Sequence, residues 1–387
     1  KNPFLKKRNV IVVKNTQDAL HSLAYGYRRF CCNPQVVAIT GSSGKTTTKT
    51  ILTKILQESG SCLPSDDNFN NEIGVPKKIL TLTKNHLYAV IELGARNVGD
   101  IAPLTELVNP QVSICLNVGS AHLGVFGSVE NLRKTKLEIL ANSGESCRKI
   151  VYGDDETLRR QASFLTKDLI TFGYTEGCST QVLSYELLSE NLATLKLKIF
   201  DHKMTLKLSA THDSMPLNCA AAATAAYLVG ASFQQIKSGI EKYTPPRGRY
   251  FSYQKKGLTI IDDTYNSNPE SVFSGLRSLQ KTYGKKYKAV IVLGDMLELG
   301  EKSRQLHEEV GAFCASKIKP SFLITVGEHS KWTQESAIKK GFSIKKCQHF
   351  ADVEALIHSK IKLLELGSVV YAKGSNSIQL DKYLDFI

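Results

Sequence analysis

Short apolar runs of strand-forming residues alternate with stretches of helical periodicity along most of this chain. The first unit is the run Val36–Ile39, then a polar turn, then a helical pattern with its apolar positions on one face and a stop at Gly60. Patterns typical of buried strands follow at Tyr88–Gly94 and Val112–Asn117. Strands and helices that alternate in this way predict an α/β fold with a mostly parallel sheet.

The pattern changes between residues 149 and 209. Apolar residues alternate with lysines from Leu195 to Ile199, a turn falls at Asp201-His202, and the period of two resumes as far as Leu208. This alternation predicts antiparallel strands. An alanine-rich helix is expected over Asn218–Val229, where Gly230 would end it.

The segment Thr244–Arg249 breaks every periodicity and predicts a domain boundary. Strand and helix patterns then resume. The expected strands are Leu258–Asp262, Ala289–Leu293, Phe322–Val326 and Ser368–Ala372, and the expected helices lie near 270–281, 304–317 and 352–364. This predicts a second, Rossmann-like α/β domain. Polar segments with glycines follow three of its strands, and we expect them to line one crevice at the carboxyl edge of the sheet.

The first 30 residues predict only a short strand, Val10–Val13, and a helix, Thr16–Arg29. They are too few for a domain, so we interpret them as the end of a preceding domain or as a linker. The predicted organisation is therefore residues 1–30 as this remnant, 31–246 as a central domain and 247–387 as a C-terminal domain.

Composition narrows the classes of protein. With 42% hydrophobic and 22% charged residues, the chain resembles globular rather than disordered proteins. A net charge of +14 suits polyanionic partners such as nucleotides, but the lysines are dispersed, so we expect no nucleic-acid partner. The nine cysteines contain no C-x-x-C pair, which argues against zinc and disulfides and favours the cytoplasm. No apolar stretch is long enough for membrane insertion.

A glycine-rich turn separates the first strand from the first long helix. It reads Gly41-Ser42-Ser43-Gly44-Lys45-Thr46-Thr47. A strand, a glycine turn and a helix N-terminus in this order form a phosphate cradle, in which Lys45 would reach the terminal phosphates and Thr46 would bind Mg²⁺. The general P-loop pattern requires a glycine where this chain has Ile39, so a simple glycine turn is the alternative. The flanking strand and helix favour nucleotide binding, and the shortened loop argues against ordinary kinases and GTPases.

Polar residues near this turn are candidates for metal or phosphate contacts. Glu92 interrupts an apolar run where its strand ends, which makes it a metal-ligand candidate, with a salt-bridged glutamate as the alternative. His122 follows the next strand and would contact Mg²⁺ or phosphate, or be merely solvated. The polar segment Pro64–Pro76 predicts a loop that could supply amides to a γ-phosphate or metal, with a simple turn as the alternative. Asn70 and Asn71 are candidate substrate contacts in it.

Together these segments resemble the Mur ligases, the ATP-dependent amide-forming enzymes of peptidoglycan precursor synthesis. The resemblance runs from about Ile11 to Leu384 and rests on motifs in matching order: Thr40–Thr47, Asn68–Pro76, Ala121-His122 and Lys136–Ile139. Asp263–Ser271 and Leu293–Gly300 resemble the subfamily that joins D-alanyl-D-alanine to UDP-N-acetylmuramoyl-tripeptide. The resemblance implies a uridine-diphosphate domain, of which residues 1–30 would be the end, a central P-loop-type ATPase domain and a C-terminal amino-substrate domain. We expect a monomer.

The resemblance also implies ATP and Mg²⁺ as cofactors and an acyl-phosphate intermediate. Thr46 and Glu92 would hold one Mg²⁺, and His122 and Lys136 would serve a second site. Because an ammonium beside Mg²⁺ is repelled, Lys136 would be carbamylated by CO₂, as in relatives; a solvated helix lysine is the alternative.

Further roles are implied for the C-terminal domain. Arg249 would bind the ATP phosphates on domain closure, Asn266 and Asn268 would hold adenine or ribose, and Asp295 and Lys373 would contact the incoming dipeptide. Polar capping of loops is the alternative for these C-terminal side chains.

Two positions depart from the family pattern. The family commonly has His-Asn before the alanine-rich helix, whereas this chain has His212-Asp213, with Asn218 later than usual. Where the family often has Lys-Gly-Ser-Arg, this chain has Asn376 in the last position, which removes a cation that would bind a carboxylate.

Two other functions stay open at this point. One is another ligase of the superfamily, MurE-like or folylpolyglutamate-synthase-like, with a different acceptor. The other is a non-catalytic nucleotide-binding protein or a basic nucleic-acid-binding protein. The presence of Glu92, His122 and Lys136 together favours an enzyme.

Overall fold

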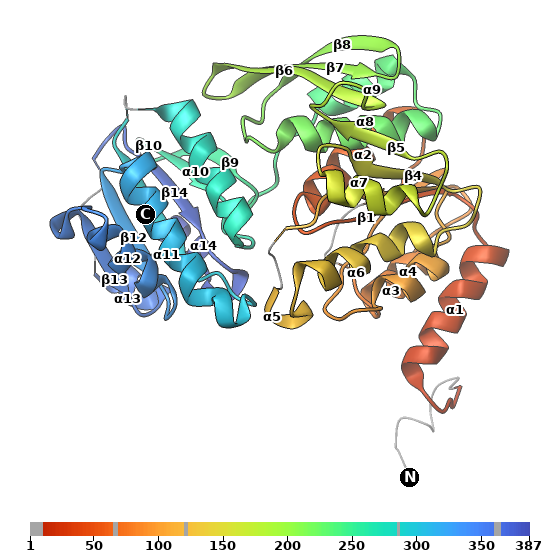
Figure 1. Cartoon of the computed structure of the whole chain (residues 1–387), viewed down its shortest axis with the longest axis horizontal. Coiled ribbons are helices and arrows are strands. Elements are labelled where there is room, and N and C mark those ends of the chain that lie inside the picture. Colours follow the sequence, from red (N-terminus) through yellow and green to blue (C-terminus); the bar gives the residue numbers. More distant parts are fainter. Residues whose placement is uncertain (1–10, 65–68, 120–122, 285–286, 360–364) are drawn as a thin grey trace.

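The chain forms two α/β parts, each built on its own sheet (Figure 1). The computed structural model describes residues 11–64, 69–119, 123–284, 287–359 and 365–387. The first part contains an eight-stranded sheet and the second a six-stranded sheet. The fold class therefore agrees with the α/β fold that the sequence predicts.

The first sheet has the strand order β2-β1-β3-β4-β5-β6-β7-β8. Its strands are β1 (Gln35–Thr40), β2 (Tyr88–Glu92), β3 (Val112–Cys115), β4 (Arg148–Tyr152), β5 (Ile170–Gly173), β6 (Thr180–Ser189), β7 (Leu192–Ile199) and β8 (His202–Leu208). The pairs from β2 to β6 are parallel, and β6, β7 and β8 pair antiparallel. The predicted change from parallel to antiparallel strands is confirmed.

Helices cover both faces of this sheet. They are α1 (Thr16–Phe30), α2 (Lys45–Ser59), α3 (Gly74–Ile79), α4 (Ile101–Val108), α5 (Leu123–Phe126), α6 (Val129–Ala141), α7 (Glu156–Ser163), α8 (Met215–Leu228) and α9 (Phe233–Glu241). Successive residues of β1 point to opposite faces, so Val37 and Ile39 join one apolar core with α2 and α8, while Val36 and Ala38 join another with α4 and α6. Both faces of β1 are therefore buried, as its uninterrupted apolar run predicts.

The second sheet has the order β13-β12-β11-β14-β10-β9 and is parallel except for β9. Its strands are β9 (Phe251–Lys255), β10 (Leu258–Asp262), β11 (Ala289–Gly294), β12 (Phe322–Val326), β13 (Cys347–Phe350) and β14 (Val369–Lys373), and its helices are α10 (Pro269–Tyr283), α11 (Ser303–Phe313), α12 (Ser330–Lys339), α13 (Val353–His358) and α14 (Leu380–Phe386). Two apolar clusters, one on each face, form its core. This is the predicted doubly wound arrangement.

Several predicted elements differ from the structure. Residues 11–13 of the expected first strand are irregular and exposed, because no described strand pairs with them, and Val10 lies outside the described residues. Helix α3 begins at Gly74, inside the expected polar loop. The expected helix at 304–317 is α11 followed by a π-helical turn at Cys314–Ile318. Of the helix expected at 352–364, α13 covers 353–358, and 360–364 lie outside the described residues.

Helix α1 packs against the first part of the molecule. The buried guanidinium of Arg28 donates to the carbonyl oxygens of Val108, Cys32 and Pro34, and Tyr27 Oη donates to Leu82 O at 2.7 Å. These bonds and the packing of α1 on α3 and α4 hold this helix against the first part. Among the described helices, none combines the length and the apolar character that crossing a membrane requires.

Candidate active site between the two parts

A cavity of about 1550 Å³ lies between the two α/β parts. The glycine-rich turn lines it from the first part, and the segments after β10, β11 and β14 line it from the second. The prediction that the three polar strand ends share one crevice is therefore confirmed, and the first sheet contributes the opposite wall. Residues that lie far apart in the sequence therefore face the same space.

Two positions of the glycine-rich turn have a backbone conformation and close neighbours that leave no room for a side chain. Gly44, which precedes α2, has φ +79°, and a Cβ atom there would lie 2.5 Å from Asn218 Oδ1. Gly41 has φ +155°, and its Cβ atom would lie 2.9 Å from Leu116 Cβ. Asn218 thus packs directly against the turn from α8, despite its later position in the sequence. A Cβ atom at either position would displace its neighbour, so the turn requires glycine at both.

Asn117 holds the turn in place. Its Oδ1 accepts hydrogen bonds from Ser42 N at 3.1 Å and Ser43 N at 2.9 Å, and its Nδ2 donates to Ser43 O at 3.1 Å. The sequence analysis did not identify this residue as functional. The available signal was an amide directly after β3, because β3 lies beside β1 in the sheet and their carboxyl ends are adjacent.

Glu92 and Thr46 come together at the carboxyl ends of β1 and β2. Thr46 Oγ1 donates to Glu92 Oε2 at 3.1 Å, and Asn70 Nδ2 donates to Glu92 Oε1 at 3.0 Å. Glu92 is only 6% exposed. Burial raises the pKa of this carboxyl, but the charges of Lys45 and Lys49 and the Asn70 hydrogen bond outweigh burial and hold the pKa below its usual value. Glu92 is therefore an anion at neutral pH.

Lys49 Nζ lies 3.8 Å from Glu92 Oε2, and two further lysines, from α2 and α6, line the cavity and have lowered pKa values. Lys45 Nζ donates to Gly41 O at 2.7 Å, and burial lowers the pKa of Lys45 although Glu92 opposes the change. Lys136, on α6, is 2% exposed, and burial together with the charge of Lys45 lowers the pKa of Lys136 to about 7. The predicted partner His122 lies outside the described residues.

Arg249 connects the two parts at this site. Its Nη2 donates to Thr46 Oγ1 at 3.1 Å, and its guanidinium carbon lies 3.8 Å from the centroid of the Tyr265 ring. The preceding Gly248 has φ +78°, and a Cβ atom there would lie 2.9 Å from Tyr265 Cβ. The Arg-Gly-Arg sequence therefore lets the chain turn closely past Tyr265, which stacks on the guanidinium and orients it.

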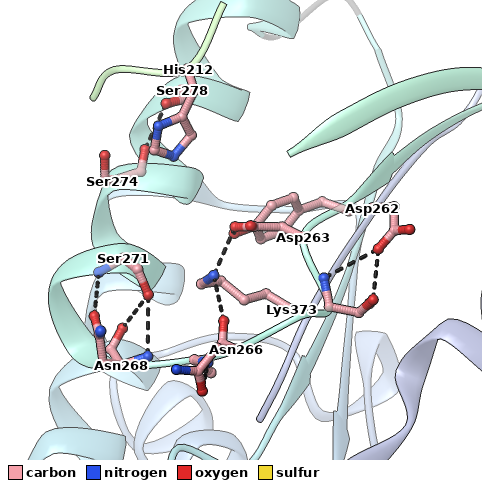
Figure 2. A network of polar contacts seen from close by, with 12 residues as sticks. His212, Asp262, Asp263, Asn266, Asn268, Ser271, Ser274, Ser278 and Lys373 are labelled. Carbon is pink, nitrogen blue, oxygen red and sulfur yellow. Dashed lines mark hydrogen bonds and ion pairs between the residues drawn. The ribbon is translucent and has the colours of Figure 1, made fainter. Parts of the chain in front are cut away.

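Lys373 lies at the centre of a buried polar network in the second part. Figure 2 shows Lys373 between Asp263 and Asn266: its Nζ lies 2.9 Å from Asp263 Oδ2 and donates to Asn266 O at 2.9 Å. Tyr371 Oη also donates to Asp263 Oδ2, at 3.0 Å. Asn268 caps α10, since its Oδ1 accepts from Ser271 N at 2.9 Å. Asn266, Asn268 and Lys373 all line the cavity.

Asp295 is oriented differently from the other predicted site residues. Its Oδ1 accepts from Ser330 N at 2.6 Å at the start of α12, and Asp295 is not among the described residues that line the cavity. Leu297 and Glu298, from the same motif, do line it. Neutral His307 fixes this motif, because its Nε2 accepts from Met296 N at 3.0 Å and its Nδ1 donates to Ser303 O at 2.7 Å.

The oxygen atoms near the turn suit a hard cation. A carboxylate from Glu92 and a hydroxyl from Thr46 converge, and such oxygens are the ligands that Mg²⁺ takes when nucleotide phosphates and water complete its shell. Within the described residues, no group of three or more His, Cys, Asp or Glu side chains could hold a metal without such help. The residues present therefore fit a Mg²⁺ that arrives with a nucleotide.

Comparison with known proteins places this geometry in a family. The model of the Mur ligase middle domain matches residues 39–226, and the model of the Mur ligase glutamate ligase domain matches residues 248–376. The chain belongs to the Mur ligase family. The first match ends at residue 226 and the second begins at residue 248.

Similar Mur ligases share most of this chain. It is 32% identical over 372 residues to the UDP-N-acetylmuramoyl-tripeptide–D-alanyl-D-alanine ligase of Synechocystis, which covers 95% of this chain and 78% of that relative. The Escherichia coli ligase of the same name is 32% identical over 379 residues, covering 96% of this chain and 80% of that ligase.

Solved structures of Mur ligases agree with this fold. MurF from Acinetobacter baumannii has a TM-score of 0.88 at 30% identity, covering 98% of this chain and 83% of that one. MurF from Thermotoga maritima in complex with ADP has a TM-score of 0.84 at 29% identity, covering 98% and 86%. The Thermotoga maritima protein was therefore solved with an adenine nucleotide bound.

Proposed function

We propose that this Mur ligase joins D-alanyl-D-alanine to UDP-N-acetylmuramoyl-tripeptide at the expense of ATP. The central observation is that Lys45, the Glu92–Thr46 pair and Arg249 converge at one end of a cavity whose other wall carries Lys373. The similarity to ligases named for these two substrates supports the same pair here.

An amine cannot displace an oxygen directly from the donor carboxylate, because oxide is a poor leaving group, so the carboxylate must first be phosphorylated. An oxygen of the donor carboxylate attacks the γ-phosphorus of ATP, the bond to the β–γ bridging oxygen breaks, and ADP leaves. The acceptor amine then attacks the acyl carbon, the bond to phosphate breaks, and the amine loses a proton as phosphate departs. Several anions crowd together in the first step, so cationic and amide groups that face them lower the barrier.

Each residue of the first part has a role in that step. The amides of Gly44 and of the first turn of α2 would bind the phosphates, because Asn117 already accepts from the amides of Ser42 and Ser43. Lys45 would move from Gly41 O to the terminal phosphates. Thr46 and Glu92 would hold Mg²⁺, which when bound neutralises phosphate charge. Arg249 reaches the same place only while the two parts are closed, so it would couple closure to phosphoryl transfer.

Lys136 is proposed as a carbamate. Its pKa of about 7 keeps much of the amine neutral at physiological pH, and a neutral amine can attack CO₂ and release a proton. The product is an anion, which could serve with His122 as a ligand of a second cation. The resemblance to carbamylated relatives is what carries this assignment.

The second part would bind the remaining groups. Asn266 and Asn268 would contact adenine or ribose, and Lys373 would bind the acceptor dipeptide with Asn70 and Asn71 facing from the first part. Asp295 would join them only after releasing Ser330 N. We also propose that residues 31–246 and 247–387 are the domains that close, and that the protein is a cytoplasmic monomer.

The decisive experiment measures ADP release by the purified protein. We expect release to require ATP, Mg²⁺, UDP-muramoyl-tripeptide and D-alanyl-D-alanine together. Single amino acids in place of the dipeptide test a MurE-like acceptor, and glutamate with a folate tests a folylpolyglutamate-synthase-like one. Binding of ATP without any substrate-dependent release would contradict the ligase assignment. Light scattering during gel filtration tests the monomer.

A further inference from the structure

One part of the cavity, here called the α1 arm, is lined by three segments of the first part of the molecule. They are the beginning of α1, the segment 94–100 and the first turn of α4. None of the roles proposed above uses this arm. Its residues therefore need a separate explanation.

The segment between β2 and α4 is held by two carboxylates. Asp100 Oδ2 accepts from Arg96 N at 2.8 Å and from Asn97 N at 2.7 Å. Glu138 accepts from Gly99 N at 2.9 Å and from Ile101 N and Ala102 N at 3.0 Å each. These five bonds fix the segment before any ligand arrives.

Glu138 also links this segment to the reaction centre. It lies two residues after Lys136 on α6, so the helix that carries Lys136 also holds the start of α4. The position of the Arg96–Asp100 segment relative to Lys136 is therefore set by direct bonds, which is the preorganisation that a binding site needs.

Arg96 presents its side chain from this fixed segment. The side chain is exposed and, within the described residues, makes no hydrogen bond or ion pair. Among the described residues that line this arm, no other lysine or arginine is present. A guanidinium held on a rigid backbone beside a cavity, with its donors unused, is suited to bind a carboxylate or phosphate in a bidentate manner.

We propose that Arg96 binds an anionic group of the donor substrate. The inference rests on the proposed function, because the donor carboxylate must reach Lys45 while the acceptor enters beside Lys373. The rest of the donor then extends into the α1 arm. A uridine-diphosphate-linked peptide carries both diphosphate and carboxylate anions. Either anion can accept two N–H hydrogen bonds from the Arg96 guanidinium.

The test compares Arg96→Ala and Arg96→Lys with the wild type. Steady-state kinetics should show the donor KM raised at least tenfold in Arg96→Ala and less in Arg96→Lys, with kcat and the KM for ATP within threefold. Arg160→Ala, an exposed arginine of α7 away from the cavity, is the matched control and should change nothing. An unchanged donor KM, or an equal rise in the KM for ATP, would overturn the proposal.

Calorimetry separates this inference from the proposed function and identifies the anion. Binding of the intact donor without ATP should weaken about tenfold in Arg96→Ala even if no turnover is detected. If Arg96 binds the diphosphate, UDP alone should show the same loss. If it binds a carboxylate, muramoyl-tripeptide without UDP should show it. If the wild type and Arg96→Ala bind the intact donor equally well, the role of Arg96 is refuted and the ligase function is unaffected. If the wild type binds the donor but never turns it over, the ligase function is refuted.

Discussion

Arg249 and Thr46 belong to different α/β parts, yet the guanidinium Nη2 and the hydroxyl Oγ1 are 3.1 Å apart. This bond places a cation from the second part at the second residue of helix α2 of the first. The Tyr265 ring stacks on the same guanidinium and limits its rotation. The proposed phosphate site therefore takes residues from both parts, with Thr46 from the first and Arg249 from the second.

Arg249→Ala should lower kcat/KM at least a hundredfold, because it removes the cation that we propose faces the transferred phosphoryl group. Arg247→Ala is the matched control. Arg247 lies two residues earlier, is exposed and pairs with Asp385, so its loss should change kcat/KM less than twofold. Steady-state ADP release measures both. Similar losses in the two variants would show a general effect on the linker rather than a specific contact.

Gly44→Ala should destabilise the protein and prevent nucleotide binding. The added Cβ would meet Asn218 Oδ1 at 2.5 Å, and φ +79° strains any residue with a side chain. We expect a cost of roughly 2 kcal/mol. Gly26→Ala in α1, where nothing lies within 4 Å, should instead stabilise by about 1 kcal/mol through helix propensity. Thermal unfolding with and without ADP compares them, and a stable, nucleotide-binding Gly44→Ala would contradict the packing argument.

Lys136→Ala should abolish activity, and short carboxylic acids should restore part of it. The acid would occupy the space of the missing carbamate and supply its negative charge. ADP release with increasing acetate or propionate measures the rescue, with Lys134→Ala on the same helix as the control. Full activity of Lys136→Ala without added acid would exclude the carbamate role.

Glu138→Ala should loosen the start of α4 and raise the donor KM several-fold, because three amide N–H groups lose their acceptor. Glu138→Gln keeps one carbonyl oxygen and should retain part of the affinity. The ATP KM should stay nearly constant in both variants. Hydrogen exchange of the Gly99, Ile101 and Ala102 amides measures the loosening directly, and unchanged protection in Glu138→Ala would contradict the proposed anchoring.

Stability should fall as the pH is lowered from about 6.5 to 4, and His212 should account for part of the fall. Burial lowers the pKa of His212 to about 4, with Asp263 opposing the change. The unfolded chain binds this proton at a higher pH than the folded protein does. The free energy of unfolding therefore falls as the pH is lowered through this window, by about 3 kcal/mol at most. His212→Gln should make the pH dependence shallower. Melting temperatures between pH 4 and 7 measure this, and parallel curves for the two proteins would contradict it.

Predictions from the sequence were most accurate for locally encoded features. The strands Leu258–Asp262 and Phe322–Val326 match β10 and β12, because a short apolar run between polar turns has few alternatives. The glycine turn was identifiable because its residues are consecutive. By contrast, Ile11–Val13 has the same apolar character and forms no strand, since a strand requires a partner that sequence periodicity does not supply.

The sequence by itself determined the order of strands and helices, the α/β class, and the residue types that phosphate chemistry requires, because each depends on neighbours along the chain. The tertiary structure decided which distant residues meet. The strand order β2-β1-β3 brings Asn117 to the glycine turn, α8 brings Asn218 to Gly44, and α6 brings Glu138 to the segment that carries Arg96. These contacts depend on how sheets and helices pack in three dimensions, which no local pattern specifies.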